Sequence, residues 1–369
     1  MRKIGTLALA LLSLVACDNK GKEEKKEDAY SGATKTDMLY YEGEDHLKNI
    51  RQISFGGDNA EAYWSFDDSK LVFQATNKDW GAECDQIYIA NSQNSDFKKT
   101  PAQLVSTGYG RTTCSYFLPG DTTILYASTH ATDTACPAKP EKRADGKYVW
   151  PIYSSFDIYV ADLGGHIVDT LTNTEGYDAE ATVSPQGDKI VFTSLRTGDL
   201  ELFTMNIDGS DVKQITTELG YDGGAFFSPD GKKLIFRSSR PTSEEDVKIY
   251  KDLLLEGLVM PTEMELYMCD VDGSNMKQLT NFGSANWCPF FLPGGDKVIF
   301  ASNHESEKGF PFNLYTVDTL GNNLEKISGD NVFDAFPVFS NSGKYLVFSS
   351  NRNNGGTHET NLFMAEWED

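Results

Sequence analysis

Short apolar segments recur along the chain, and each one ends in an aromatic residue that is followed by polar residues. The clearest copy runs from Tyr177 to Arg196, and its nearest match runs from Tyr221 to Arg240. The aromatic residues that close the six copies are Phe73, Tyr126, Phe192, Phe236, Phe300 and Phe348. The shortest interval, from Phe192 to Phe236, is 44 residues, the length of one four-stranded propeller blade. Because one such unit cannot bury its own apolar face, the six copies must pack on one another.

Each copy predicts four strands joined by tight turns. In the copy that begins at Tyr221 the predicted strands are 225–227, 233–236, 266–269 and 276–280. A Ser-Pro-Asp-Gly turn at 228–231 separates the first two, and Asp272-Gly273 is a hairpin signal between the last two. Glycine at the end of the first turn supplies a positive φ, and Asp68 and Asp121 take this place in the first two copies.

The two ends of the repeat predict a closed ring. The last copy stops at its third strand, 361–365, and a surplus segment at 47–56 matches the fourth-strand segment at 275–283. We therefore expect the N-terminal strand to complete the last blade, which leaves only short edges. The expected fold is all-β, a six-bladed β-propeller of four-stranded blades.

The repeat resembles that of the TolB-like propeller family of bacterial envelope proteins. The resemblance rests on Ser-Pro-x-Gly turns at 184–187 and 228–231 and on Phe-x-Ser-x-Arg ends at 192–196, 236–240 and 348–352. The resemblance also includes two Asp-Gly pairs that are each followed by Lys-Gln-Ile/Leu-Thr, namely Asp208-Gly209 and Asp272-Gly273. The family includes partners of peptidoglycan-associated lipoprotein, accessory domains of peptidases and lipoproteins of unknown role. The chain departs from TolB in having no separate N-terminal α/β domain.

The first 37 residues predict export and anchoring. Residues 1–17 have a charged start and an apolar stretch, as a signal peptide does, and end in Leu-Val-Ala-Cys17, which resembles a bacterial lipobox. Lipidation of Cys17 is expected; the alternative is an ordinary signal peptide with a chance cysteine. Residues 18–37 predict a flexible charged tether, whose acidic run resembles sorting signals for surface export, and 38–369 the propeller. The expected location is the cell envelope, lipid-anchored, facing the periplasm or the surface.

Cysteine usage fits that compartment, which permits disulfides. Cys84, Cys114 and Cys136 are expected on one face, so one pair among them is predicted, with its connectivity left open. Cys269 and Cys288 are expected to be buried thiols. The spacing of Cys and His predicts neither a zinc site nor another metal site, and no cofactor is expected.

Charge argues against nucleic acid as a partner. The chain has 33 Lys and Arg residues against 55 Asp and Glu, a formal net charge of −22. This charge repels phosphate, and no basic stripe offsets it. The expected species is a monomer that touches the membrane through its lipid anchor alone.

Two insertions fall on the propeller face where strands 2 and 3 are joined, which we call the top face. The first is 131–155, and the second is 241–263, which contains a predicted helix with Ser243 as N-cap and Gly257 after its end. The insertions flank the third blade. They predict either walls of a cleft or lids packed on the blades, because long loops on a rigid scaffold often carry binding.

Aspartate at one position of the repeat occurs together with arginine at a second position. Every copy with Asp at the start of its first strand has Arg after its second, and the other copies have neither. The pairs are Asp178 with Arg196, Asp222 with Arg240, and Asp334 with Arg352. The positions lie opposite each other on a hairpin, so cross-strand pairs are favoured over a cation site at the mouth.

Catalysis is not expected. A lyase of the oligogalacturonate type would require clustered histidines. In this chain, His130 and His304 belong to copies on opposite sides of the ring. The sequence has no Gly-x-Ser-x-Gly elbow of a serine hydrolase.

The favoured interpretation is a non-catalytic scaffold that binds an envelope protein through its top face. The candidate contacts are the loop aromatics Trp80, Tyr148, Trp150, Tyr153 and Tyr250. The alternative is a binder of a peptide, glycan or other small ligand at the mouth. Its candidate polar contacts are Asp178, Glu180, Asp222, Arg196, Arg240, Asp334 and Arg352. A flat aromatic patch would favour the first interpretation, and a deep polar funnel the second.

Overall fold

The structure is a computed structural model that describes residues 39–93, 102–307, 309–329 and 332–369. The expected signal peptide, the Cys17 lipobox and the tether at 18–37 therefore lie outside the described residues. Within the described part, no helix has the length and apolar character that crossing a membrane requires.

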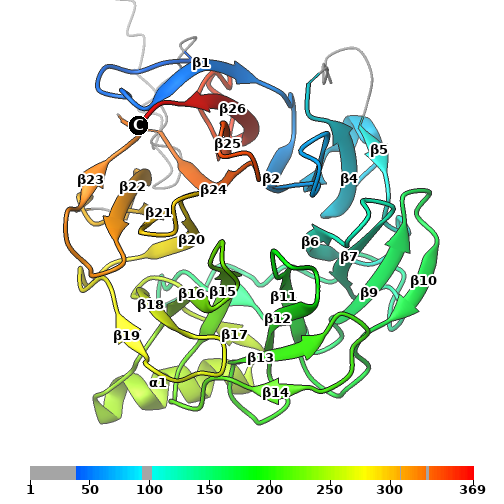
Figure 1. Ribbon diagram of the computed structural model, residues 1–369. Coiled ribbons are helices and arrows are strands. Elements are labelled where there is room, and N and C mark those ends of the chain that lie inside the picture. Colours follow the sequence, from blue (N-terminus) through cyan, green and yellow to red (C-terminus); the bar gives the residue numbers. More distant parts are fainter. Residues whose placement is uncertain (1–38, 94–101, 308, 330–331) are drawn as a thin grey trace, which may run out of the picture.

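Six four-stranded antiparallel sheets surround a central axis, so the predicted six-bladed propeller is confirmed (Figure 1). Blade 1 contains β2 (Asp58–Trp64), β3 (Lys70–Thr76), β4 (Gln86–Asn91) and β5 (Gln103–Leu104). Blade 2 contains β6 (Thr112–Phe117), β7 (Thr123–Ser128), β9 (Asp157–Asp162) and β10 (Ile167–Thr170). Blade 3 contains β11 (Asp178–Val183), β12 (Lys189–Ser194), β13 (Glu201–Asn206) and β14 (Lys213–Gln214).

The remaining blades follow the same order, with the first strand innermost. Blade 4 contains β15 (Asp222–Phe227), β16 (Lys233–Ser238), β18 (Glu265–Asp270) and β19 (Lys277–Gln278). Blade 5 contains β20 (Asn286–Phe291), β21 (Lys297–Ser302), β22 (Asn313–Asp318) and β23 (Glu325–Lys326). Blade 6 contains β24 (Asp334–Phe339), β25 (Tyr345–Ser350), β26 (Asn361–Trp367) and β1 (Leu47–Gln52). Outside the blades lie the 3₁₀ helix η1 (Lys78–Trp80), α1 (Glu244–Leu255), β8 (Trp150–Pro151) and β17 (Leu258–Val259).

Blade 6 is closed by the N-terminal strand, as the sequence predicts. β1 pairs antiparallel with β26, and Leu47 lies opposite Trp367. Just before β1, the chain is fixed by Arg352, which donates to Glu44 Oε1 at 2.8 Å and to the Leu39 carbonyl at 2.8 Å. The first and last segments of the described chain therefore share one sheet.

The core lies between neighbouring blades. The aromatic residues that close the six copies are almost completely buried there. Turn positions agree with their sequence signals as well, since Asp68 and Asp121 have φ of 58° and 54° where other blades have glycine. These buried rings explain why the aromatic position repeats.

Each innermost strand contains a β-bulge near its start. In five of these strands the register of the pairing shifts after the second residue, and the third residue has a positive φ. In β2, which begins one residue earlier, the shift follows the third residue and the fourth, Glu61, has the positive φ. Such bulges re-aim a side chain and increase the local twist. The six bulge residues with positive φ, which we call the bulge ring, are Glu61, Cys114, Glu180, Gly224, Cys288 and Phe336.

Aromatic contacts across the axis close the central channel. Tyr63 of blade 1 and Phe226 of blade 4, which lie on opposite sides of the ring, have ring centroids 5.9 Å apart. Tyr116 extends this contact on one side and Phe290 on the other, at 5.3 and 5.1 Å. A pocket of about 400 Å³ lies at one end of the axis and another of about 210 Å³ at the other end, and Phe226 lines both. The top pocket is therefore blind.

Candidate functional site

The two insertions meet above blade 3. β8, from the insertion of blade 2, pairs antiparallel with β17, from that of blade 4, and Trp150 lies opposite Val259. Helix α1 precedes β17, with Ser243 as N-cap and Gly257 at φ 70°, as expected from the sequence. The insertions thus join each other and cover one side of the top pocket. The arrangement therefore differs from both expectations drawn from the sequence, which were separate walls of a cleft and separate lids packed on the blades.

The pocket floor contains side chains from all six blades, and its walls are largely aromatic. The bulge ring, Arg237 and Tyr63 line it, together with Trp150, Tyr153, Tyr177 and Trp287. Trp150 and Trp287 have ring centroids 5.0 Å apart. The indole of Trp287 donates to the Pro261 carbonyl at 2.8 Å and so fixes the blade 4 insertion to blade 5. Concave aromatic sites with a few polar groups are typical of small-ligand pockets.

A buried ion pair lies at the centre of the floor. Arg237 Nη2 donates to Glu180 Oε1 at 2.7 Å, and both side chains are about nine-tenths buried. Glu180 also accepts from the Tyr221 hydroxyl, from Thr193 Oγ1 at 2.8 Å and from Gly224 N at 2.7 Å. Every charge in this group is therefore compensated, as burial requires.

Two glycines make this ion pair sterically feasible. A Cβ atom at Gly224 would collide with Arg237 Nη1, and one at Gly223 would collide with Glu180 Oε2. Gly224 is also the member of the bulge ring without a side chain, and its φ is +61°. Blade 4 thus leaves space at the ring, and the arginine of its second strand fills that space.

Glu61 occupies the same bulge position as Glu180 but in blade 1. Its Oε2 atom is buried and has no hydrogen-bond partner among the described residues. Burial raises the pKa of the Glu61 carboxyl to about 7, and a hydrogen bond with the Cys114 thiol opposes this shift. Glu61 is therefore a carboxyl that exchanges its proton near neutral pH.

Replacing Glu61 by Gln is expected to stabilise the protein at about pH 8 and to change little near pH 4. The folded-state pKa of Glu61 lies above its ordinary value of 4.5, so its favourable contribution is complete below pH 4.5 and is lost as pH rises through about 7. The expected gain is about 1 to 3 kcal/mol in the free energy of unfolding, measured by urea denaturation at both pH values. Glu180→Gln, at the equivalent bulge position, is the control and should destabilise. A similar loss with Glu61→Gln would contradict the prediction.

The thiols of the bulge ring are poor nucleophiles. Burial raises the pKa of Cys288 to about 12 and that of Cys114 well above its ordinary value. Thiolate is the reactive form, so both residues stay protonated and inert at neutral pH. Cys269 is buried as expected, whereas Cys288 is partly exposed to the pocket, which corrects its expected burial. The bulge causes the difference because it directs Cys288 toward the axis.

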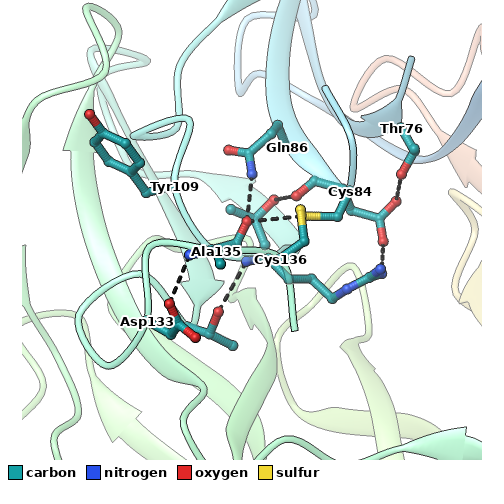
Figure 2. The surroundings of a disulfide bond; sticks show 12 residues. Thr76, Cys84, Gln86, Tyr109, Asp133, Ala135 and Cys136 are labelled. Carbon is teal, nitrogen blue, oxygen red and sulfur yellow. Dashed lines mark hydrogen bonds and ion pairs between the residues drawn. A yellow bond between two sulfur atoms is a disulfide. The ribbon is translucent and has the colours of Figure 1, made fainter. Parts of the chain in front are cut away.

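A disulfide joins Cys84 of blade 1 to Cys136 of the blade 2 insertion (Figure 2). Beside it, Asp85 accepts from Thr76 Oγ1 at 2.6 Å and pairs with Arg111, and both charged residues line the pocket rim. The loop before β6 contributes Tyr109, which is 58% exposed and whose ring points away from the disulfide (Figure 2). The disulfide thus holds the blade 2 insertion close to the pocket.

The predicted Asp–Arg pairs are present in all three blades. Arg196 lies 3.0 Å from Asp178, Arg240 lies 2.6 Å from Asp222, and Arg352 lies 2.8 Å from Asp334. All three aspartates are buried, so these pairs differ from exposed ion pairs, which contribute about 0 to 1 kcal/mol each. These six residues do not line the top pocket, whereas Glu180 does.

Asp222→Asn is expected to lower the free energy of unfolding by roughly 1 to 3 kcal/mol, because a charged hydrogen bond to Arg240 is lost. The metal content of the purified protein should not change. Thermal denaturation and elemental analysis of both proteins measure these two quantities. A drop in bound metal would contradict the prediction and revive the cation-site hypothesis.

The aromatic residues expected to form contacts are mostly packed within the protein. Tyr250 is buried and its hydroxyl donates to Asp199, while Trp80 packs against Tyr88 at 5.0 Å between ring centroids. The Tyr153 hydroxyl donates to the Ala138 carbonyl at 2.9 Å. Trp150 lines the pocket, and Tyr148 beside it remains 37% exposed.

Two histidines of the repeat, His130 and His304, pack on aromatic rings. His130 packs on Tyr159, and His304 packs between Phe282 and Tyr315. In the part of the chain that the structure describes, no group of three or more His, Cys, Asp or Glu residues could hold a metal ion.

Sequence reasoning missed Arg237, although a signal for it exists. The residue directly after the closing aromatic is small or uncharged in the other five copies: Gln74, Ala127, Thr193, Ala301 and Ser349. An arginine at this position, next to a Gly-Gly pair, departs from the repeat. Such departures from a repeat mark candidate functional residues better than the repeat itself does.

Comparison with known proteins supports the fold. Residues 148–255 match the family described as TolB beta propeller domain. A putative TolB from Agrobacterium tumefaciens has a TM-score of 0.53 and 18% identity, and the match covers 87% of this chain and 97% of that one. TolB from Acinetobacter baumannii has a TM-score of 0.50 and 18% identity, with 85% of this chain and 64% of that one covered.

A propeller enzyme has a comparable similarity. An oligogalacturonate lyase in complex with manganese has a TM-score of 0.50 and 12% identity, with 87% of this chain and 93% of that one covered. A comparison with curated proteins finds no match. At such low identities these likenesses concern the fold alone.

Proposed function

We propose that this chain, which is a TolB-like β-propeller, is a non-catalytic binding protein of the bacterial cell envelope. It takes a small ligand or the end of a peptide into the blind pocket of its top face. The observation that carries the proposal is this pocket of about 400 Å³, with aromatic walls and charged groups on its floor. Pockets of this size and character bind small molecules or single chain ends.

Of the two interpretations drawn from the sequence, we favour the ligand binder over the protein-binding scaffold. A protein-binding scaffold was expected to expose aromatic anchors, yet Trp80, Trp150 and Tyr250 are engaged in internal packing. The polar groups that support a ligand instead are the buried Glu180–Arg237 pair and Glu61, whose Oε2 atom is buried without a hydrogen-bond partner among the described residues. A deep site with polar groups at its floor favours a ligand over a flat protein interface.

The envelope location rests on the lipobox-like sequence at Cys17. Mass spectrometry of the mature N-terminus after cell fractionation tests it. A diacylated or triacylated Cys17 in the membrane fraction is the expected result. An unlipidated chain in the cytoplasm would refute the location.

A pocket-filling variant tests the binding function. Phe336 shows that an aromatic side chain is accepted at the bulge position of blade 6, so Cys288→Phe should fold and fill the pocket from blade 5. Cys288→Ser is the matched control, because it keeps the pocket volume. Peptide and glycan libraries should stabilise the wild type and Cys288→Ser in thermal-shift assays, and Cys288→Phe should bind the same hits at least about 10-fold more weakly. Equal binding by Cys288→Phe would exclude the pocket.

A protein partner remains a second candidate because two aromatic rings are exposed on the top face. Tyr109 and Tyr148 are 58% and 37% exposed, and loops of blade 2 carry both. Crosslinking in intact envelopes compares wild type with a Trp150→Ala/Tyr148→Ala double variant. One envelope protein captured by the wild type and lost in the variant would favour the scaffold.

A further inference from the structure

We propose that the pocket selects a ligand with a positively charged amine, and that Glu61 is the residue that pairs with this group. The inference rests on the proposed binding function and names its ligand class. It follows from the charges of the pocket, from the internal symmetry of the blades and from the nature of the walls.

Among the charged residues that line the pocket, one carboxyl has no arginine or lysine of the lining as its partner. Glu180 pairs with Arg237, and Asp85 pairs with Arg111. Glu61 is the remaining acidic residue of the lining, and the lining has no third arginine or lysine. Its ionised form therefore gives the pocket a net negative charge, which a cationic ligand would neutralise.

The pseudo-sixfold symmetry shows what a glutamate at this bulge position binds. Glu180 of blade 3 receives the guanidinium of Arg237, which comes from the second strand of the next blade. For Glu61, the next blade is blade 2, and the residue equivalent to Arg237 is Ala127, since each pairs with the second residue of its first strand. Blade 2 therefore supplies no cation at the equivalent position. A ligand amine near Glu61 would take the role that Arg237 has beside Glu180.

One further partner of Glu180, the bulge amide of the next blade, is also engaged elsewhere in the case of Glu61. Glu180 accepts a hydrogen bond from the bulge amide of the next blade, Gly224 N, at 2.7 Å. In blade 2 the equivalent amide, that of Cys114, donates instead to Gln74 Oε1 at 3.3 Å. Gln74 therefore accepts the hydrogen bond that, by analogy with Glu180, Glu61 would accept. Glu61 Oε2 is buried without a hydrogen-bond partner among the described residues. An unpaired buried carboxylate oxygen is costly, so pairing with a ligand would be correspondingly favourable.

The walls suit an organic cation as well. Arg237 already stacks on two of them, with its guanidinium carbon 5.5 Å from the Trp150 ring centroid and 5.2 Å from that of Tyr221. Aromatic faces attract cations, and a carboxylate beside them fixes the position of the charge. Trp287 and Tyr177 add further aromatic surface on the same pocket.

Binding should depend on pH through Glu61. The charged or titratable groups that act on its carboxyl are Cys114, Glu180, Arg237 and Asp85, and burial is the largest influence on its pKa. An amine pairs with the ionised carboxylate, so affinity should rise between about pH 6 and pH 8 as Glu61 loses its proton. Phenethylamine stays protonated over this range, so the change would report on the protein.

Isothermal titration with two matched probes tests the proposal. Phenethylamine carries the charge, and phenethyl alcohol has the same ring and chain without it. Wild type should bind the amine at least about 10-fold more tightly than the alcohol at about pH 8. Glu61→Gln should lose that preference and its pH dependence, while Glu201→Gln, the same change at a buried glutamate that does not line the pocket, should keep both. A dipeptide with a free N-terminus, compared with its N-acetylated form, repeats the test with a second amine.

The outcomes separate this inference from the proposed function. If Glu61→Gln binds the amine as tightly as wild type does, or if neutral and acetylated probes bind equally well, cation recognition is refuted. In that case the binding function would still stand, provided that Cys288→Phe blocks the probes that bind. If wild type binds none of the probes and no library hit, both proposals fail.

Discussion

Replacing Arg352 by Ala is expected to cost about 3 to 5 kcal/mol of the free energy of unfolding, the range for breaking a buried ion pair. The guanidinium is completely buried and donates to Glu44 Oε1, to Asp334 Oδ2 and to the Leu39 carbonyl, each at 2.8 Å. It also stacks on Tyr41, 5.0 Å from that ring centroid. The variant would leave two carboxylates buried without their cation and would detach the segment before β1.

Urea denaturation of the wild type and the variant measures this loss. Arg196→Ala is the matched control, because Arg196 pairs with the single carboxylate of Asp178 and is 19% exposed, so its loss should be clearly smaller. Burial already raises the pKa of Glu44 above its ordinary value, and its protonation would relieve part of the cost. The deficit of Arg352→Ala should therefore shrink toward about pH 4. Equal losses for the two variants would show that the contacts of Arg352 with Glu44 and the N-terminal segment add nothing to the free energy of unfolding.

Replacing Cys136 by Ser is expected to lower the free energy of unfolding by about 2 to 4 kcal/mol. The disulfide with Cys84 spans a sequence separation of 52 residues, and a loop of that length loses on the order of 4 kcal/mol of unfolded-state entropy when it is closed. The bond also fixes the insertion that carries β8, so its loss should loosen the cover of the pocket.

Thermal denaturation with and without a thiol reductant measures this effect. Reduced wild type should behave as Cys136→Ser does, and the variant itself should be indifferent to the reductant. Cys269→Ser serves as the control, because Cys269 is a buried thiol outside the disulfide. A wild-type melting temperature that is unchanged by reductant would contradict the prediction.

The architecture could be predicted from the sequence because it depends on repeated local signals. The closing aromatics and turn residues such as Asp68 recur with the blade, and β1 repeats the pattern of a fourth strand. The Asp–Arg pairs were predictable for the same reason, since the two residue types occur together in the same three copies. Comparison among the copies does the work of an alignment in such a chain.

The site could be predicted only in part. Glu180 was a candidate contact, but Glu61 at the same bulge position was not recognised, because a bulge at a non-glycine residue leaves no local sequence signal. The pairing of β8 with β17 was equally hidden. It joins two segments of two residues each that are separated by most of two blades, and neither has an alternating pattern. Long-range contacts of such short segments are decided by the packing of the whole ring.

The pairing of β1 with β26 brings the described ends of the chain together: the Glu368 amide donates to the His46 carbonyl at 3.0 Å. Adjacent ends favour circular permutation, in which a short linker joins them and new ends open elsewhere. Opening the chain between β14 and β15, which belong to different blades, would give a protein in which every blade is built from consecutive strands (Figure 1). The ring would then be held by side-chain packing alone at the new ends. Comparing its refolding with that of the natural order would show how far the shared blade, rather than the repeat, guides assembly.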